Sequence, residues 1–507
     1  MGMVLGIDLG TTNVKACLYT EAGVFVDSGS EGYGLLQPRE GWKEQNPQAW
    51  WRATCLAIRR AVGNRKSQVH CLAVSSQAPS LTPVDADFKP LRNALIWMDT
   101  RADSQCAALK ETIGRERYHR LNGADPDPYY LLPKLLWFRE NEPRLFEKTA
   151  HVLTTNGYIN ARLTGQVGLD FPQAALLTHC YDLKTQTWSS LISQKTGLPL
   201  TDLFPRLMQP WDLLGRVSAQ AAEETGLQAG TAVLCGTADG LAAQLEAGLT
   251  QPGTMSLTLG TSSMLLYALG GQPAPGTPLM PMAQPFGLAE VPYILSASVN
   301  TAGAAAAWSY QLLENRDTID DEFEAQAAHA TPGSGGLMFL PTLAGERAPL
   351  WNRRLSGAFI GLTLQTGRSD MYRALLEGTA FAALYATQAA AKAGFGLATV
   401  RAGGAGARNR LWVKIHASML RQPVHVALHG GGAPMGDAML ACFALARQGS
   451  LTDVMNRFLR TEETVEPVAA WETRYEALYP LFCQAQHNLA PCMERLHDLS
   501  AQWEGEA

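Results

Sequence analysis

The stretch GIDLGTTNVKA, residues 6–16, reads as an apolar strand, a tight Gly-Thr turn and a second strand. A stretch with the same order of residue types, SLTLGTSSMLL at residues 256–266, follows later in the chain. The two turns, at Gly10 and Gly260, are separated by close to half of the 507 residues. One such hairpin arises easily by chance, but two at this spacing predict two similar α/β domains that face one cleft.

Strand-like and helix-like runs alternate along the rest of the chain, which is typical of layered α/β folds. Apolar runs predict strands at residues 69–75 and 95–97. Periodic runs predict helices at 48–61, 101–113, 133–141, 370–394, 411–420 and 434–447. The tail after Pro467 is also predicted to be helical.

The composition is that of an ordinary globular protein, with 46% hydrophobic and 17% charged residues. A net charge of −5 without a long basic run argues against nucleic-acid binding. No basic region precedes the first apolar run, and the uncharged stretches 247–289 and 291–313 are interrupted by small or polar residues, so we expect neither a signal peptide nor a membrane span. Nine scattered cysteines without Cys-x-x-Cys spacing predict reduced thiols and a cytoplasmic location.

The first hairpin has the groups needed to bind a phosphorylated ligand. Backbone N–H groups of such a turn can contact phosphate oxygens, and the hydroxyls of Thr11 and Thr12 can donate hydrogen bonds. Lys15 adds a cation, and Asp8 at the end of the strand can hold Mg²⁺ through water. The alternative is an ordinary hairpin with a solvent-facing lysine.

Two further segments are candidates for ligand contact. The stretch GGAGARN at 403–409 follows a short apolar run and precedes a helix, so its backbone can pass close to a ring or a phosphate, or can simply form a tight turn. Asp239 lies between an apolar strand and an Ala-rich helix. It is either an N-cap or a carboxylate that accepts a hydroxyl proton during phosphoryl transfer.

Taken together, the chain resembles the FGGY family of carbohydrate kinases, most closely its xylulokinase branch, over residues 4–485. The run KLLWFREN at 134–141 is similar to the first family signature. The run GAFIGL at 357–362, followed by the helical stretch containing 370–378, is similar to the second. The run GERAPLW at 345–351 is similar to xylulokinase-type members.

The resemblance implies two actin-like (ribonuclease H-like) α/β domains with ATP and a sugar in an interdomain cleft. The expected boundaries are 1–248 for the N-terminal domain, 249–485 for the C-terminal domain and 486–507 for a tail. It implies that Asp239 is the catalytic base and that Asp8 organises Mg²⁺. The positions that it assigns to ATP, on the two hairpins and near the adenosine, are Thr11, Thr12, Asn13, Lys15, Gly260, Thr261, Gly303, Gly404 and Asn409.

The resemblance is weaker at the substrate contacts. The candidates are Gln77, Ala78, Asp99 and Arg101 together with Asp239. Ala78 and the following proline stand where xylulokinases carry Met and His, so a sugar-contacting imidazole is missing. Asp99 and Arg101 fit the family's Trp-x-Asp-x-Arg pattern, but they could equally form an internal ion pair at a helix start.

We therefore expect ATP-dependent phosphorylation of a small sugar, with a ketose such as D-xylulose as the first candidate. Alternative substrates are a polyol, an aldonate or a hexulose. Alternatives of another class are a non-kinase actin-like ATPase and a catalytically silent sugar-binding relative. The expected partners are the sugar and ATP, without nucleic acid or membrane, and a homodimer is the candidate assembly.

Overall fold

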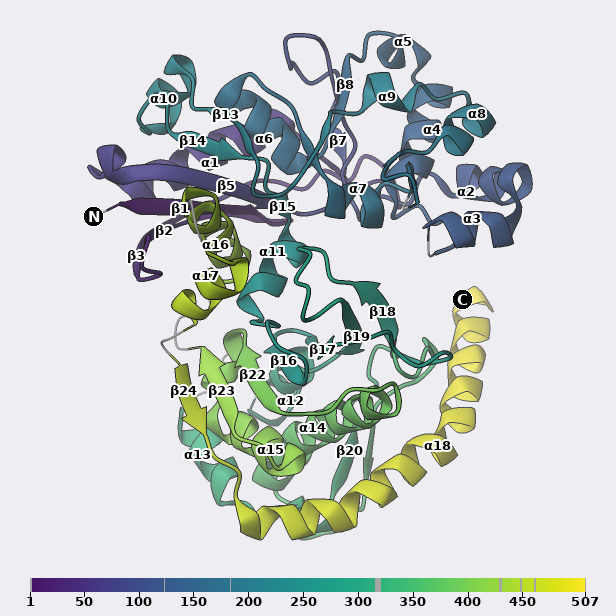
Figure 1. Cartoon of the computed structure of the whole chain (residues 1–507). Coiled ribbons are helices and arrows are strands. Elements are labelled where there is room, and N and C mark those ends of the chain that lie inside the picture. The colour runs from purple at the N-terminus through teal and green to yellow at the C-terminus, as the bar shows by residue number, and fades with distance from the viewer. Residues whose placement is uncertain are drawn as a thin grey trace. The chain divides into compact units, whose positions relative to one another are not determined.

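Seven residues from Met3 to Leu9 form the strand β1, and six of them are buried because β1 lies in the middle of a sheet. The structure is a computed structural model that describes residues 2–122, 124–182, 184–314, 321–427, 431–446, 449–459 and 462–506. The chain divides into two compact units (Figure 1). Unit 1 comprises Met1–Glu246 and Gly431–Phe458, and unit 2 comprises Ala247–Gly430 and Leu459–Ala507.

The main sheet of unit 1 is built around the first predicted hairpin. β1 pairs antiparallel with β2 and parallel with β5. The order across the sheet is β13 (Leu213–Arg216), β14 (Ala232–Leu234), β5 (Val69–Ser76), β1, β2 (Asn13–Thr20) and β3 (Phe25–Gly32), with β15 (Thr237–Ala238) beside the end of β5. The register places Asp8 between Lys15 on one neighbouring strand and Ser75 on the other.

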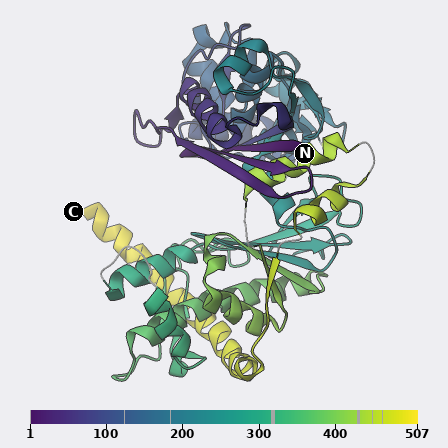
Figure 2. The same cartoon turned by 90° about the vertical axis from the view of Figure 1, so that its left-hand side faces the viewer.

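Helices cover both faces of this sheet. Leu5 and Ile7 point into a core shared with α1 (Pro47–Val62). Because side chains alternate along a strand, Gly6 and Asp8 face the opposite side, which is covered by α16 (Ala433–Leu445). A Cβ on Gly6 would lie 1.8 Å from the carbonyl oxygen of Pro434, so the helix packs directly on the strand backbone. In Figure 2, α16 and α17 (Leu451–Phe458) lie against the strands of unit 1.

Further elements of unit 1 include helices that form a second apolar cluster, helices that belong to the main core (α6 and α10), α11, and short two-stranded pairs. The helices are α2 (Asp103–Leu109), α3 (Arg115–Asn122), α4 (Leu131–Asn141), α5 (Pro143–Phe146), α6 (Thr155–Thr164), α7 (Phe171–Leu177), α8 (Ser190–Thr196), α9 (Leu200–Leu203), α10 (Ala219–Thr225) and α11 (Asp239–Glu246). The strand pairs are β4 (Glu44–Gln45) with β7 (Ala94–Leu95), β6 (Thr82–Val84) with β8 (His151–Leu153), β9 (Leu169–Asp170) with β12 (Leu207–Met208), and β10 (Tyr181–Asp182) with β11 (Thr187–Trp188).

Unit 2 repeats the central arrangement around the second predicted hairpin. β16 (Thr254–Leu259) pairs antiparallel with β17 (Ser263–Leu269) and parallel with β22 (Thr399–Gly403). The sheet continues with β19 (Tyr293–Val299) and β18 (Met280–Ala283) on one side, and with β23 (Val424–Ala427) and β24 (Glu462–Val465) on the other. The remaining elements are β20 (Met338–Leu340), β21 (Ala358–Ile360), α12 (Gly303–Glu314), α13 (Asp321–His329), α14 (Arg368–Lys392), α15 (Arg410–Leu420) and α18 (Ala469–Glu506).

Most predicted elements are present, and the differences have local causes. The 95–97 strand is shorter than predicted, because only Leu95 belongs to β7 and the chain then turns to place Trp97 near the first hairpin. The predicted 101–113 helix is divided into α2 and a following π-helical turn, residues 110–114. Arg447, the last residue of the predicted 434–447 helix, lies outside the described residues.

The course of the chain differs from a simple division into two halves. The segment 431–458 falls within the expected C-terminal domain, yet it packs with unit 1. The expected tail boundary at 485 also falls inside α18, which runs without interruption from Ala469 to Glu506.

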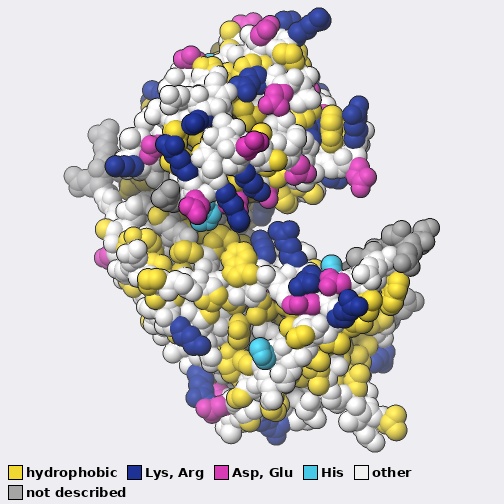
Figure 3. Space-filling view, turned by 90° about the vertical axis from the view of Figure 1, so that its right-hand side faces the viewer, with side chains coloured by type: hydrophobic (Ala, Val, Ile, Leu, Met, Phe, Trp, Pro, Cys, Tyr) yellow, Lys and Arg dark blue, Asp and Glu magenta, His cyan; other side chains and the backbone are white. Residues whose placement is uncertain are grey.

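Among the residues that the structure describes, no helix is both long and apolar enough to span a bilayer. On the face shown in Figure 3, basic side chains lie interspersed with acidic ones.

Candidate active site

Three carboxylates of unit 1 lie near the ends of β1 and β5. Asp8 is at the end of β1, Asp239 begins α11, and Asp437 comes from α16. The hydroxyl oxygen of Ser75 lies 3.2 Å from Asp8 Oδ1 and 2.6 Å from Asp437 Oδ2, so the serine bridges two of them. Burial raises the pKa of Asp8 to about 7, with the negative charge of Asp239 as the next cause, while Ser75 and Lys15 oppose the shift.

Asp239 is half-buried at the first residue of α11. Its Oδ1 accepts the N–H of the adjacent Gly240 at 2.6 Å. An N-cap side chain instead accepts from a residue two or three positions further along, and Asp239 has no such bond among the described residues. Burial raises the pKa of Asp239 to about 6, which is suitable for a group that accepts a proton near neutral pH.

The turn of the first hairpin is held by contacts that leave several donors available. Gly10 N–H donates to the carbonyl oxygen of Asn13 at 3.0 Å, which closes the turn. The Asn13 amide contacts Ser30, and Thr12 is exposed. Lys15 is half-buried directly opposite Asp8 in the register. The predicted phosphate contacts Thr11, Thr12, Asn13 and Lys15 therefore lie on one hairpin beside Asp8.

Two aromatic residues flank this hairpin. Trp97 Nε1 donates to Thr11 Oγ1 at 3.2 Å, and the Tyr129 hydroxyl donates to the carbonyl oxygen of Ala78 at 3.2 Å. Their ring centroids are 6.4 Å apart in an edge-to-face arrangement. Burial raises the pKa of Tyr129 to about 12, with smaller contributions from Tyr130 and from the charge of Asp239.

Gln77 and Ala78 continue from the end of β5 into this region. Gln77 Nε2 donates to Gln45 Oε1 at 2.6 Å, and Gln45 in turn donates to the carbonyl oxygen of Thr11 at 2.7 Å. Gln77 Oε1 is buried and has no hydrogen-bond partner among the described residues. An acceptor of this kind is suited to a ligand hydroxyl. Ala78 contributes its backbone carbonyl rather than a polar side chain.

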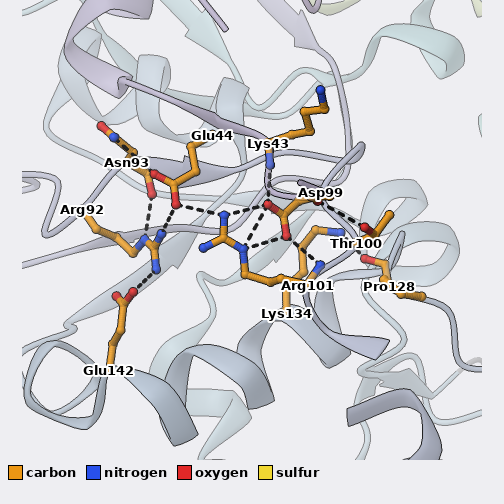
Figure 4. Close-up of polar contacts among 11 residues, drawn as sticks. Lys43, Glu44, Arg92, Asn93, Asp99, Thr100, Arg101, Pro128, Lys134 and Glu142 are labelled. Atoms are coloured by element: carbon orange, nitrogen blue, oxygen red, sulfur yellow. Dashed lines mark hydrogen bonds and ion pairs between the residues drawn. The ribbon is translucent and has the colours of Figure 1, made fainter. Parts of the chain in front are cut away.

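Asp99 and Arg101 form the centre of a buried ion network (Figure 4). Arg101 Nε lies 2.8 and 3.0 Å from the two Asp99 oxygens, and Nη2 lies 2.9 Å from Glu44 Oε1. Asp99 also accepts the backbone N–H of Lys43 at 2.6 Å. Both side chains are almost completely buried, at 0% and 1% exposure. The structure thus shows the internal ion pair, while contact of Asp99 and Arg101 with a substrate stays a prediction.

Lys134 lies in the same region and supports the aromatic residues. It is fully buried, and its ammonium group donates to the carbonyl oxygens of Pro128 and of Tyr129, the latter at 2.9 Å (Figure 4). Burial lowers its pKa to about 8, against the opposing charge of Asp99. The first signature run therefore holds the segment that carries Tyr129.

In unit 2, the second hairpin contacts the start of α12. Gly303 N–H donates to the Gly260 carbonyl oxygen at 2.9 Å, and Ala304 N–H donates to that of Thr261 at 2.9 Å. A Cβ on Gly303 would lie 2.4 Å from the oxygen of Gly260, so only glycine permits this approach. Thr261 is exposed at the tip of the turn.

The glycine-rich segment of unit 2 packs against the same hairpin. Gly404 has φ of +86°, and a Cβ there would lie 2.6 Å from the Leu259 carbonyl oxygen. Asn409 is an N-cap, because its side chain accepts the Trp412 N–H at 2.9 Å, and its amide donates to Glu324 at 2.7 Å. Gly260, Thr261, Gly303 and Gly404 are thus brought together, whereas the Asn409 side chain is engaged in structural contacts.

The structure adds Ser75, Trp97, Tyr129 and Asp437 to the predicted set. Asp437 is the single acid within the buried, otherwise apolar start of α16, and this was the sequence signal that could have drawn attention to it. Tyr129 is the first residue of a tandem Tyr-Tyr just before the signature helix, which begins at Leu131, and this tandem is the corresponding signal. Ser75 lies at the end of a buried strand, where a polar residue is a weaker indication.

Comparison with known proteins identifies the family to which this arrangement belongs. Residues 3–245 match the N-terminal domain, and residues 255–445 the C-terminal domain, of the FGGY family of carbohydrate kinases. The chain belongs to this family. The enzyme is therefore a carbohydrate kinase, and it has the two-domain, actin-like α/β fold of its relatives.

Individual relatives of this FGGY kinase match over nearly their full length. The xylulose kinase of Bacillus subtilis (strain 168) is 30% identical over 495 residues, covering 95% of this chain and 96% of the relative. A gluconokinase from Bacillus licheniformis is 26% identical over 512 residues, covering 99% and 98%. The crystal structure of a ligand-bound xylulose kinase from Lactobacillus acidophilus has a TM-score of 0.84 at 25% identity and covers 98% of this chain and 100% of that one.

Proposed function

We propose that this FGGY kinase transfers the γ-phosphoryl group of ATP to a hydroxyl of a small ketose, with D-xylulose as the first candidate and Asp239 as the general base. The observation that carries the proposal is the state of Asp239, whose Oδ1 is held by an adjacent N–H and whose pKa is raised to about 6 by burial. Such a carboxylate is positioned by the backbone and is able to take up a proton near neutral pH.

In the proposed reaction, Asp239 accepts the proton of the sugar hydroxyl as its oxygen attacks the γ-phosphorus. One P–O bond forms to the sugar, the bond between the γ-phosphorus and the bridging oxygen breaks, and its electron pair leaves with ADP. The donors of the first hairpin, Thr11, Thr12, Asn13 and Lys15, contact phosphate oxygens. Gly260, Thr261, Gly303 and Gly404 provide close backbone contacts to the nucleotide, and Asn409 supports this segment as the cap of α15.

Asp8 is the residue that we propose to hold Mg²⁺. Mg²⁺ in kinases is typically bound by one or two carboxylates together with substrate phosphates and water, and a single half-buried aspartate fits this pattern. Burial raises the pKa of Asp8, the negative charge of Asp239 adds to that shift, and Lys15 opposes it only in part, so a cation at this position would stabilise the ionised carboxylate. When bound, the metal supplies neutralisation of phosphate charge.

The sugar is proposed to lie against Trp97, Tyr129, Gln77 and the backbone of Ala78. Gln77 Oε1, which has no hydrogen-bond partner among the described residues, can accept a hydrogen bond from a sugar hydroxyl. The apolar ring faces suit the C–H surface of a small carbohydrate. We assign Asp99 and Arg101 to the support of this wall, since Asp99 is bonded to Arg101 and to the backbone of Lys43, and Arg101 is bonded to Asp99 and Glu44. Arg101 Nη1 has no hydrogen-bond partner among the described residues and can also donate to a ligand hydroxyl.

The acceptor is tested by measuring ADP release in the presence of D-xylulose, other pentuloses, hexuloses, gluconate and polyols, with MgATP in excess. We expect the highest kcat/KM with D-xylulose. A clear preference for gluconate would overturn the ketose assignment while leaving the kinase reaction intact. ATP hydrolysis that no member of the panel stimulates would overturn the small-carbohydrate assignment itself.

A further inference from the structure

Asp437 is a buried acid that the proposed reaction does not use. Its side chain is completely buried, and Oδ1 has no hydrogen-bond partner among the described residues. Oδ2 accepts both the hydroxyl of Ser75 at 2.6 Å and its backbone N–H at 3.1 Å. A half-satisfied buried carboxylate is costly to retain, so its presence calls for an explanation.

The position of Asp437 depends on the close packing of α16. Gly6 on β1 meets the first turn of the helix at the Pro434 carbonyl, and a Cβ on Gly436 would lie 2.0 Å from the Ala242 carbonyl oxygen of α11. These two glycine contacts fix the helix on the strand face that also carries Asp8. Asp437 is therefore delivered to the end of β5 by packing that has little freedom to shift.

Ser75 connects Asp437 to Asp8. A serine hydroxyl has one proton, so it donates to one carboxylate at a time, and Asp437 at 2.6 Å is nearer than Asp8 at 3.2 Å. The two bonds from Ser75 to Asp437, one from the side chain and one from the backbone, restrict the serine to one rotamer. The hydroxyl oxygen then limits where Asp8 Oδ1 can lie.

We propose that Asp437 is a positioning residue, which acts through Ser75 to orient Asp8 for the divalent cation that accompanies the nucleotide. The inference rests on the metal-binding role proposed for Asp8. Groups that orient a metal ligand typically contribute 10–100-fold to metal affinity, so the contact between Ser75 and Asp437 matters even though neither residue binds the ion.

The test compares the variants Asp437→Ala, Asp437→Asn and Ser75→Ala with the native enzyme. ADP affinity is measured by calorimetry with and without Mg²⁺, and the Mg²⁺ concentration for half-maximal turnover is measured separately. We expect Asp437→Ala and Ser75→Ala to weaken the Mg²⁺-dependent gain in ADP affinity by about tenfold or more. Asp437→Asn retains an acceptor oxygen for Ser75 and should restore most of that gain, while ADP affinity without Mg²⁺ is unchanged in all three.

Two reference variants distinguish an error in the metal-binding role of Asp8 from an error in the positioning role of Asp437. Asp453→Asn replaces an exposed acid of α17 in the same segment and should leave all values unchanged. Asp8→Ala should abolish the Mg²⁺-dependent gain in ADP affinity. If it does not, the proposed role of Asp8 is wrong, and this inference is wrong with it.

If Asp8→Ala does abolish that gain but Ser75→Ala and Asp437→Ala behave like the native enzyme, only the positioning role is overturned. Equal losses in Asp437→Ala and Asp437→Asn with none in Ser75→Ala would also overturn it, since charge rather than positioning would then be responsible. Thermal unfolding of each variant verifies that the comparison is made on folded protein.

Discussion

Asp239 and Asp437 show how two aspartates of one unit differ in use. Asp239 is half-buried and uses one oxygen for an adjacent backbone N–H, so its other oxygen remains available to a substrate. Asp437 has no exposed surface and is bonded to Ser75. Exposure and hydrogen-bond partners therefore suit the carboxylate of Asp239 to proton transfer. They suit the carboxylate of Asp437 to orienting its neighbour Ser75.

Replacement of Asp239 by Asn should lower kcat by roughly 10² to 10⁴-fold, because general-base assistance typically contributes that much. The KM for the sugar should change much less, since the amide keeps the shape of the side chain. Steady-state kinetics on the preferred acceptor measure both values. Asp87→Asn, an exposed acid paired with Lys89, is the matched control and should retain native activity. Turnover near the native level in the Asp239 variant would show that another group accepts the proton.

The same residue predicts a pH dependence. Its base form is the deprotonated one, so kcat/KM should rise with pH through an apparent pKa near 6 and then level off. Because Asp239 and Asp8 influence each other, that apparent value belongs to the pair. A pH–rate profile from about pH 5 to 8.5 at saturating MgATP measures it. A profile that is flat down to pH 5 would contradict the assignment.

The contact between helices α11 and α16 depends on one small residue, Gly436. A Cβ on Gly436 of α16 would lie 2.0 Å from the carbonyl oxygen of Ala242 in α11, so one of the two helices would have to shift. We expect Gly436→Ala to destabilise unit 1 by roughly 1–3 kcal/mol, as overpacking does. Thermal or denaturant unfolding measures this change.

Gly240→Ala on α11 is the matched control for stability, because a Cβ there meets no atom within 4 Å. That substitution should be neutral or should stabilise the helix by up to about 1 kcal/mol. If both variants unfold alike, the α11–α16 contact is looser than the structure shows.

The elements were predictable to the extent that local pattern determines them. The two Gly-Thr hairpins and the helices α1, α4, α14 and α15 follow from apolar periodicity and turn residues, and the structure contains them close to the predicted bounds. The partnership between Ser75 and Asp437 spans 362 positions, and no local pattern encodes it. The ion network of Asp99 and Arg101 likewise includes Glu44, which lies on a different segment and could not be assigned to it from local sequence.

For the whole molecule, the sequence predicted two similar halves but not the interleaved course of the chain. Unit 1 is completed by residues 431–458, which follow most of unit 2 in the sequence. The repeated Gly-Thr segments at Gly10 and Gly260 locate the central hairpin of each unit. They do not indicate against which unit a later helix, such as α16, will pack. That assignment is made by side-chain and backbone packing such as the contact between Gly6 and Pro434.

This course predicts the behaviour of fragments. Residues 1–246 alone lack α16, so the Gly6 face of β1 would be uncovered, and we expect this fragment to aggregate or to bind a hydrophobic dye such as ANS. Joining 431–458 to it through a short flexible linker should restore cooperative unfolding. The junction is favourable because α11, which ends at Glu246, packs against α16, which begins at Ala433. Equally cooperative unfolding of both fragments would show that α16 is dispensable for unit 1.

α16 is synthesised long after the strands of unit 1 against which it packs. On the ribosome, the sheet of unit 1 is translated early, but the helix that covers one of its faces emerges only after residues 247–430 have been added. At roughly 5–20 residues per second, this interval lasts on the order of 10 to 40 s. During that time the nascent chain presents an open apolar face, so the synthesis of this enzyme should depend on chaperones most strongly while its middle third is being translated.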